Sequence, residues 1–508
     1  MAPGGRVAEK VVLLVQLNDL YQIDTSADYT DDAALILPRI STLVSRLRNI
    51  YGHDRVRFCL PGDFLAPSCL SKEFKGKQMV DILNRMGLDF VSFGNHEFER
   101  EISTCDLVAR MDQSRFKWLN VNFEFWDDVL HDRLIDSDKM HPVESIRLSE
   151  SHDLLLFGVL NTESPEHVGR VHKDPKEFLL SIFETARKAQ AAAARATPAR
   201  DVGFTFVAMT HQKLNDDRKL AKECPELALI MGGHDHNVHI RSRVKRCLIV
   251  KAASNARTLR LNWVVAVPRF PAEGTAPPDP ETERDRFATF AKELLGRVAV
   301  KPLRQALLRT RRPSAAQAED LYQFVTEMGF ADQRHEIDYR VEGNELIFVI
   351  SSALNTRHPA FQRLIPSNAK LHNRIRSWNK KSKHSEAPII IAPVELVLED
   401  ARVRRCSTNF GNLTADIMRG HLALRAPSRL EADVGLINSG SFRIDRNIER
   451  DEPISPRTMC DVFYHPNKVN RYTLKGEALT RLLEQSLVMD DNYFCRSTTT
   501  TSAGRPPY

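Results

Sequence analysis

The stretch VVLLVQLND, residues 11–19, decides the fold class of this chain, because a short apolar run ends there on a carboxylate. Only VVLLV is strongly hydrophobic, which is too short for the core of a signal peptide and far too short to span a membrane. The run therefore predicts a buried strand. Asp19 stands where that strand is expected to end.

Apolar runs of the same kind follow as far as Val267 and alternate with helical patterns. Their sequences are VRFCL, DFVSF, LLLFGVL, FTFVAM, LALIM, CLIV and LNWVVAV. Between the first two, residues 71–87 carry apolar side chains at helical spacing, and Gly87 supplies a stop. Strand, helix and strand in this rhythm predict an α/β layered domain.

The bulk properties argue against several classes of protein. With 508 residues, of which 42% are hydrophobic, the chain is long enough for about two to four domains. The net charge of +6 is spread along it, and no run of lysines and arginines alternates with aromatics as on a nucleic-acid surface. No hydrophobic tail of the GPI-anchor type ends the sequence. We therefore expect neither a nucleic-acid polymer nor a membrane as a partner.

The cysteines are scattered through the chain without CxxC spacing. Several stand inside apolar strand patterns such as FCL and CLIV, which favours core thiols over disulfides or a zinc site. Thiols of this kind are typical of a reducing compartment, so we expect a cytoplasmic protein. The eight are Cys59, Cys69, Cys105, Cys224, Cys247, Cys406, Cys460 and Cys495.

Composition predicts the domain boundaries. Residues 268–280 are rich in proline and glycine and interrupt the pattern, which predicts a first domain over residues 1–267. Residues 268–366 are expected to form a linking or inserted module, with helical character over 281–329 and a hairpin over 339–351. A second domain is expected over residues 367–508, beginning with a helix over 367–385. The tail STTTTSAGRPPY, residues 497–508, is expected to be disordered.

Polar side chains concentrate where the predicted strands end. In an open α/β sheet, ligands are held at strand ends because side chains leave the packed core there and can converge on one cleft. Taken singly, each residue also fits a local role, such as a turn or cap for an aspartate. Their order at five strand ends favours a metal site. The residues are Asp19, Asp63, Asn95 with His96, His211, and His234 with His236.

These side chains are the ones that hard divalent ions prefer, namely carboxylates, amide oxygens and neutral imidazoles. A carboxylate shared between two ions holds them about 3.5–4 Å apart, and such a pair suits phosphate ester hydrolysis. A bridging water becomes hydroxide near neutral pH and attacks in line with the departing oxygen.

The surroundings of these residues resemble the metallophosphoesterases of the 5'-nucleotidase family. The five metal motifs of that family read NDLY, GDFLAPS, SFGNHEFE, MTHQKLNDD and MGGHDH here, in the family's order. The family's C-terminal domain is recognisable in TNFGNLTADIMR and GLINSGSFRIDRNI. The resemblance covers most of the chain outside residues 268–366. It implies an α/β fold in which a four-layer αββα, calcineurin-like metallophosphoesterase domain precedes a smaller α/β 5'-nucleotidase-type C-terminal domain.

The resemblance implies a role for each site residue. Asp63 would bridge two divalent metal ions, which the family pattern leaves open as Mn, Zn, Mg or Co. His96 would be the catalytic histidine that protonates the leaving oxygen, and Glu99, in place of the family's usual aspartate, would orient its ring. The other metal ligands would be Asp19 and His236 for the first ion, and Asn95, His211 and His234 for the second.

Tyr21 is the main departure from the family pattern, because a histidine ligand is expected two positions after Asp19. A neutral phenol is a poor ligand, so the tyrosine could bind as phenolate, leave the position to water, or leave the first metal site empty. We favour water, because Asp19, Asp63 and His236 are all retained. Some cytosolic eukaryotic members resemble this chain in carrying NDVY here, which makes Tyr21 look like a feature of that branch.

Substrate recognition belongs to the C-terminal domain in this family, through arginines and two aromatics that clamp the base. Arg443 and Arg404 match the arginines, although each also fits a surface ion pair. His465, in YHPN, stands where a phenylalanine is expected and would stack more weakly. For the second aromatic, either Tyr493 or Phe494 substitutes or the element is missing.

The resulting hypothesis is a metal-dependent phosphomonoesterase that hydrolyses a nucleotide or a similar small organic phosphate. Two alternatives within the enzymes are a phosphatase of sugar phosphates or phosphoglycerates and a 2',3'-cyclic phosphodiesterase. An alternative of another class is a catalytically silent protein used for sensing or interaction, which Tyr21 and the altered C-terminal motifs would favour.

Overall fold

The computed structural model of the chain falls into two compact units. One comprises Met1–Ala66 and Phe74–Lys380, and the other Pro67–Glu73 and Lys381–Tyr508. The structure describes residues 10–25, 35–99, 102–161, 169–171, 203–236, 238–268, 293–308, 314–327, 336–342, 345–384, 387–403, 406–425, 432–442, 446–464 and 469–486, with the single residues 176, 184, 290 and 444. The low-complexity stretch 191–198 and the tail 497–508 lie outside the described residues.

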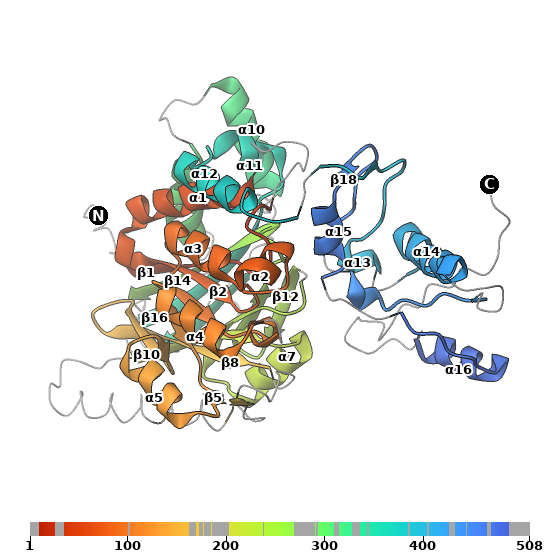
Figure 1. Cartoon of the computed structure of the whole chain (residues 1–508). Coiled ribbons are helices and arrows are strands. Elements are labelled where there is room, and N and C mark those ends of the chain that lie inside the picture. Colours follow the sequence, from red (N-terminus) through yellow and green to blue (C-terminus); the bar gives the residue numbers. More distant parts are fainter. Residues whose placement is uncertain are drawn as a thin grey trace. The chain divides into compact units, whose positions relative to one another are not determined.

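Two sheets form the centre of the first unit (Figure 1). The larger has the strand order β15 (Glu336–Glu342), β16 (Glu345–Asn355), β14 (Thr258–Pro268), β1 (Lys10–Gln16), β2 (Val56–Pro61), β3 (Phe90–Ser92), β4 (Lys117–Leu119) and β6 (Met140–His141). The smaller has the order β12 (His239–Val244), β13 (Cys247–Lys251), β11 (Leu227–Gly232), β10 (Gly203–His211), β8 (His152–Leu160) and β7 (Glu144–Arg147). Each apolar run singled out in the sequence therefore forms a strand.

The alternation of side chains along the strands explains why the sheets stack. On β10, Val207 and Met209 enter one core cluster with residues of β1 and β14, so that cluster fills the space between the two sheets. Phe206 and Ala208, on the opposite face, enter a second cluster with α7 (Leu214–Glu223). Successive side chains on a strand point to opposite faces, so a strand buried on both faces is apolar throughout.

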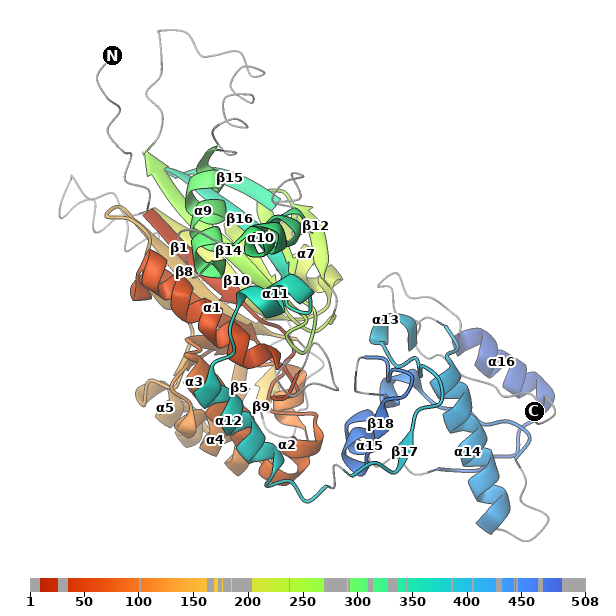
Figure 2. The same ribbon diagram turned by 90° about the horizontal axis from the view of Figure 1, so that it is seen from above.

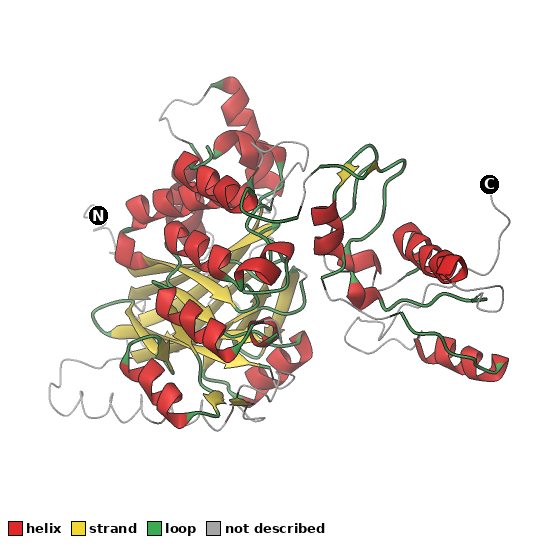
Figure 3. Ribbon diagram, viewed as in Figure 1, coloured by secondary structure: helices red, strands yellow, loops and turns green. Residues whose placement is uncertain are grey.

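Helices cover the outer face of the larger sheet. Helix α1 (Ile36–Tyr51) contacts β2 and is flanked by α3 (Lys77–Met86) and α9 (Lys301–Leu307). Seen from above, α1 runs along the sheet, and the ribbon coloured by secondary structure shows strands enclosed by helices (Figures 2 and 3). The four-layer αββα fold class expected from the resemblance is confirmed.

The helix predicted over residues 71–87 is two helices in the structure. Helix α2 (Cys69–Phe74) ends before Lys75 and Gly76, whose φ angles of 51° and 76° are left-handed and cannot continue a helix. Helix α3 then runs to Gly87, which has φ 73° and donates its N–H to the last turn. The predicted stop at Gly87 is confirmed, while the break before α3 has a local backbone cause.

The described parts of residues 268–366 do not stand apart as a linking module. Strand β16 pairs with β14 from Thr258↔Asn355 to Pro268↔Glu345, so the predicted hairpin extends the larger sheet. Its Ile347 and Val349 lie in the core between the sheets. Burying this apolar strand satisfies the backbone groups of β14, which a separate module would leave at a sheet edge. Residues 268–366 also contain η4 (Gly296–Val300), α9, α10 (Ala315–Glu327) and α11 (Pro359–Leu364).

The helix expected at the start of the second domain belongs to the first unit. Helix α12 (Ala369–Asn379) packs on α3, and Trp378 meets Phe74 with ring centroids 5.1 Å apart. Both Trp378 and Arg374 donate hydrogen bonds to Asp81. The division of the chain therefore falls after Lys380 and not at residue 366.

The second unit has its own small core. Phe410, Phe442 and Phe463 pack against one another, and Leu396 and Ile448 join them.

None of the described helices is long and apolar enough to cross a membrane. The second unit contains β17 (Ile390–Ile391), β18 (Pro453–Ile454), α13 (Asp400–Val403), α14 (Asn409–Arg425), η5 (Ser439–Ser441), α15 (Pro456–Val462) and α16 (Gly476–Ser486).

Candidate metal centre

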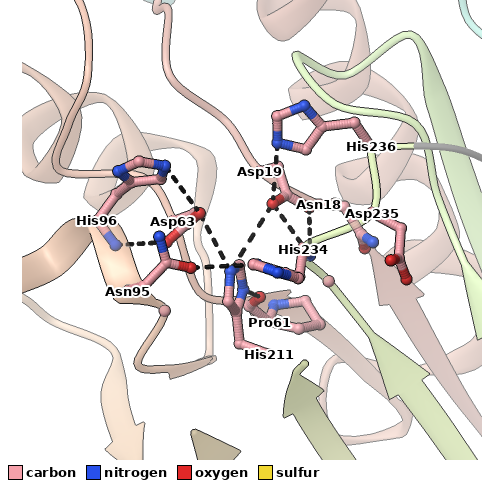
Figure 4. A network of polar contacts seen from close by, with 12 residues as sticks. Asn18, Asp19, Pro61, Asp63, Asn95, His96, His211, His234, Asp235 and His236 are labelled. Atoms are coloured by element: carbon pink, nitrogen blue, oxygen red, sulfur yellow. Dashed lines mark hydrogen bonds and ion pairs between the residues drawn. The ribbon is translucent and has the colours of Figure 1, made fainter. Parts of the chain in front are cut away.

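The two sheets bring the five strand ends to one place. Strands β1, β2 and β3 are parallel neighbours, as are β10 and β11, so their carboxyl ends lie at common edges. Figure 4 shows the side chains of these ends pointing toward one another. The predicted site residues gathered there are Asp19, Asp63, Asn95, His96, His211, His234 and His236.

Four of these residues have a left-handed backbone. The φ angles are 44° at Asp19, 56° at Asp63, 77° at His234 and 60° at His236. Non-glycine residues rarely adopt this region, and each instance costs of order 1–3 kcal/mol unless the surroundings enforce it. Backbone strain of this kind is concentrated at functional sites, because the strained conformation directs a side chain to a position that a regular strand does not allow.

Gly94 allows the loop after β3 to approach the loop after β2. A Cβ atom added at Gly94 would lie 2.2 Å from Oδ1 of Asp63. Its N–H instead donates to the buried carboxylate of Glu97 at 2.7 Å. The glycine of the GNHE motif is therefore required by packing against Asp63.

Asp63, His211 and His234 form a group of potential metal ligands. Their ligand atoms all lie within 4.8 Å of one another. Nε2 of His211 is 3.1 Å from Oδ2 of Asp63, and Nδ1 of His234 is 3.1 Å from Oδ1 of Asn95. Carboxylate, amide and imidazole donors thus converge as the predicted second metal position requires.

Nε2 of His211 is a buried polar atom without a hydrogen-bond partner. Nδ1 of the same ring lies 2.7 Å from the carbonyl oxygen of Pro61, so it donates its proton there. In a neutral ring, Nε2 would then direct a lone pair at Asp63 and at Oδ1 of Asp19, 4.0 Å away. That arrangement is unfavourable without a cation between the groups, so the donor set fits a metal ion.

The electrostatics of the site lead to the same conclusion. Burial lowers the pKa of His211, but the carboxylates of Asp63 and Asp19 outweigh it and raise the pKa to about 10. Burial likewise opposes ionisation of Asp63, whose pKa nevertheless lies below its usual range because of His211 and His96. The carboxylates therefore attract a positive charge to the position of Nε2.

The first metal position is less tightly gathered. Oδ1 of Asp19 lies 3.5 Å from Nε2 of His236, and both carboxylate oxygens of Asp19 accept the backbone N–H of His234 at 3.1 Å. The hydroxyl of Tyr21 lies 2.8 Å from Nε2 of His236 and donates to Oδ2 of Asp63 at 3.1 Å. The phenol thus stands among the ligands predicted for the first ion, where the family's histidine would be.

His96 lies beside Asp63 on the opposite side from His211. Its backbone N–H donates to Oδ1 of Asp63 at 2.8 Å, and its Nε2 is 3.8 Å from Oδ2. Its Nδ1 pairs with Oε1 of Glu99, the carboxylate predicted to orient the ring. The ring is therefore held by a carboxylate at one nitrogen while the other faces the centre.

Glu97 is a structural residue of the site that the sequence reasoning missed. Its fully buried carboxylate accepts four backbone N–H groups, those of Asp63, Phe64, Leu65 and Gly94, at 2.7–3.1 Å. This one side chain fixes the loop after β2 to the loop after β3. The signal available in the sequence was an acidic residue in NHEF, beside the predicted ligand Asn95 and the catalytic His96.

Lys251, at the end of β13, was also missed. Its buried ammonium donates to the carbonyls of Gln212, next to His211, and of Gly233, next to His234. The same ammonium forms ion pairs with Asp217 and Asp235. Burial lowers the pKa of Lys251, but the two carboxylates outweigh it and raise it. A cation inside the strand CLIVK gave no periodic signal, because its partners lie in α7 and in the loops after β10 and β11.

The predicted substrate-binding residues Arg404, Arg443 and His465 lie outside the described residues, and so do Tyr493 and Phe494. Their proposed roles stay predictions.

Comparison with known proteins finds similarity to 5'-nucleotidases. Residues 389–504 match the family described as the 5'-nucleotidase C-terminal domain. Protein 5NUC of Lutzomyia longipalpis is 25% identical over 201 residues, which are 39% of this chain and 32% of that protein. This chain thus spans about a third of the length of that relative.

Two solved structures share the fold. A 5'-nucleotidase precursor from Thermus thermophilus has a TM-score of 0.57 at 17% identity, and the match covers 89% of this chain and 74% of that one. The sulfate thiohydrolase SoxB of the same species has a TM-score of 0.54 at 12% identity, over 92% and 75%. The two names describe different reactions, so the shared fold does not identify the bond that is cleaved.

Proposed function

We propose that this chain is a metal-dependent phosphomonoesterase. The observation that carries the proposal is the buried, unpartnered Nε2 of His211, which faces the carboxylates of Asp63 and Asp19. A neutral His211 ring would place a lone pair against two carboxylates, so the site favours a cation at this position. Strained ligand loops support the same reading, since their cost is offset when a bound ion holds them.

The residues present fit divalent metal. Asp63, Asn95, His211 and His234 would hold one ion tightly, and Asp19 with His236 would complete a second position around Asp63. When bound, such ions neutralise phosphate oxygens and lower the pKa of a coordinated water. The donor set of oxygen and imidazole nitrogen suits Mn, Mg, Zn or Co and does not choose among them.

His96 and Glu99 would handle the proton of the leaving group. Glu99 accepts the hydrogen of Nδ1, which fixes the tautomer and leaves Nε2 toward the centre. A proton held on Nε2 is then on an atom 3.8 Å from Oδ2 of Asp63, beside the place where a phosphate would approach. His96 is thus the group positioned to stabilise the phosphate and protonate the departing oxygen.

Tyr21 would limit the first metal position. Its neutral hydroxyl donates to Asp63, so one lone pair of the bridging carboxylate is already used. We infer that water completes the coordination of the first ion and that this ion binds more weakly than the second.

A nucleotide is the substrate class that we propose, on the strength of the match of residues 389–504 to the 5'-nucleotidase C-terminal domain. Arg404, Arg443 and His465 are the proposed recognition residues. Sugar phosphates, phosphoglycerates and 2',3'-cyclic nucleotides are the competing substrates. A cytoplasmic location, in keeping with the free cysteines among the described residues, is part of the same proposal.

The direct test uses the full chain, stripped with a chelator and reconstituted separately with Mn, Co, Zn and Mg. Hydrolysis of an activated aryl phosphate is expected with at least one metal, and His96→Ala should lose most of the rate. His53→Ala is the matched control, because His53 is exposed and lies before β2, at the opposite end of that strand from Asp63.

Equal rates for His96→Ala and the wild type would remove the enzyme hypothesis in favour of a silent, ligand-sensing protein. Once activity is established, phosphate release from nucleotides, sugar phosphates and phosphoglycerates is compared. A preference outside the nucleotides by more than about tenfold in kcat/KM, or about 1.4 kcal/mol, would replace the proposed substrate class.

A further inference from the structure

A second cluster of metal-type ligands lies within the second unit. Cys69 begins α2, Cys460 lies in α15, and His384 stands between α12 and β17. Figure 2 labels the two helices that carry the cysteines. The ligand atoms of these three residues all lie within 4.8 Å of one another. None of them belongs to the motifs of the candidate phosphoesterase site.

The separation of Cys460 and His384 is close to an edge of a tetrahedral site. Sγ of Cys460 lies 3.9 Å from Nε2 of His384, and the thiols of Cys69 and Cys460 interact directly. Zinc–sulfur bonds of about 2.3 Å and zinc–nitrogen bonds of about 2.0–2.1 Å place tetrahedral ligands roughly 3.5–3.8 Å apart. The donors therefore need only small shifts to share one ion.

A lysine lies beside the cluster. Cys69 is fully buried, while Cys460 is partly exposed. The Lys72 ammonium lies 3.7 Å from Sγ of Cys460.

The backbone around the cluster is already fixed. The N–H of Cys69 donates to Oδ1 of Asp461 at 2.8 Å, which ties α2 to α15. On the other side, Glu73 accepts the hydroxyl of Ser382 at 2.6 Å and the N–H of Lys383 at 2.9 Å, which holds the segment that carries His384. Two independent attachments therefore present the three donors, which lowers the ordering cost of binding an ion.

We propose that Cys69, Cys460 and His384 form a site for a thiophilic divalent ion such as Zn²⁺. Two thiolates and a neutral imidazole neutralise a divalent charge, and three protein donors leave one position open toward solvent, where the side chain of His384 is 38% exposed. Soft thiolate donors distinguish this site from the oxygen and nitrogen donors of the phosphoesterase centre. The inference does not depend on the proposed function.

Cobalt(II) is the probe that separates the two sites. The reduced, metal-free full chain is titrated with Co²⁺ under argon, and a thiolate-to-cobalt charge-transfer band is expected in the near ultraviolet. The phosphoesterase centre contains no thiolate, so it cannot give this band. Added Zn²⁺ should bleach it, because Zn²⁺ binds such sites more tightly.

Cys460→Ser should abolish the band, while Cys406→Ser, which changes an exposed cysteine of the same unit, should retain it. Even supporting residues outside the ligand set cost about 10–100-fold in metal affinity, so loss of a ligand should weaken Zn²⁺ binding by more than that. Cys69→Ser is measured in parallel with circular dichroism, since Cys69 is buried and its replacement can unfold α2. Cys460→Ser keeps the test valid in that event.

A fully reduced wild type without the band would overturn the proposal, as would a band that persists in Cys460→Ser. Peptide mapping of the aerobic protein completes the experiment. A Cys69–Cys460 disulfide combined with no cobalt band after reduction would identify a redox pair in place of a metal site.

Discussion

The hydroxyl oxygen of Tyr21 lies 2.8 Å from Nε2 of His236 and 3.1 Å from Oδ2 of Asp63. The side chain of Tyr21, which is only 5% exposed, thus lies on the side of the centre where the first ion is expected. The remaining ligands are arranged around it. This relationship makes Tyr21 the residue whose replacement says most about metal stoichiometry.

Tyr21→His should raise occupancy of the first metal position, because a neutral imidazole is a better ligand than a neutral phenol. Elemental analysis and calorimetric titration of the full chain measure the change. Tyr21→Phe is the matched control, because it removes the hydroxyl without supplying a ligand, and it should not lower the metal content, since we infer that water completes the coordination. A fall in metal content in Tyr21→Phe would identify the phenolic oxygen as a ligand. A wild type that already holds two ions, unchanged in Tyr21→His, would contradict the weak first position.

Glu97→Gln should destabilise the loop that carries Asp63. An amide has one acceptor oxygen, so its nitrogen would face at least one pair of the four buried N–H groups that Glu97 now satisfies. Unsatisfied buried donors cost about 1–3 kcal/mol each, so we expect a loss of roughly 2–5 kcal/mol in the free energy of unfolding, together with weaker metal binding.

Glu99→Gln separates the two carboxylates of this motif. It changes the partner of the His96 ring and leaves the loop contacts in place, so it should lower kcat while stability and metal content stay near wild type. Equal effects of the two variants on unfolding would show that Glu97 has no special structural role.

Lys251→Met should be strongly destabilising, because it leaves Asp217 and Asp235 as buried carboxylates without their cation. Removing one partner of a buried ion pair costs about 3–5 kcal/mol. Urea unfolding measures the loss. The control is Lys245→Met, an exposed lysine before β13, which should change stability by less than about 0.5 kcal/mol. Recovery of stability in a Lys251→Met, Asp217→Asn, Asp235→Asn variant would confirm the electrostatic cause, and no recovery would indicate a packing defect.

His152 should make stability depend on pH between about 4 and 6.5. Burial lowers its pKa from 6.5 to about 4, so the unfolded chain takes up a proton more readily than the folded one. The contribution is present above pH 6.5 and is lost as the pH falls toward 4, amounting to about 3 kcal/mol.

His152→Gln should remove that part of the pH dependence, so its free energy of unfolding, relative to wild type, should rise by about 3 kcal/mol from pH 7 to pH 4. His53→Gln, at an exposed position, should follow the wild-type curve. Parallel curves for His152→Gln and wild type would show that the ring titrates normally in the folded protein.

The strands and most of the site follow from local patterns in the sequence. Apolar runs such as those of β1 and β10 are local signals, and the ligands that follow them are placed at strand ends by chain direction alone. The predicted metal residues meet for this reason. Gly87 ended its helix as predicted, because a left-handed C-cap is also a local requirement.

Which segments meet across long separations became visible only in the folded chain. It placed β16 beside β14, Glu97 under the Asp63 loop, Lys251 between two ligand loops, and the Tyr21 hydroxyl against His236. It also brought Cys69 to Cys460, although no CxxC spacing links them in the sequence. Such contacts join residues far apart in the chain, so neither helical nor strand periodicity records them. They depend on which faces pack together, and that is settled by burial of the whole chain at once.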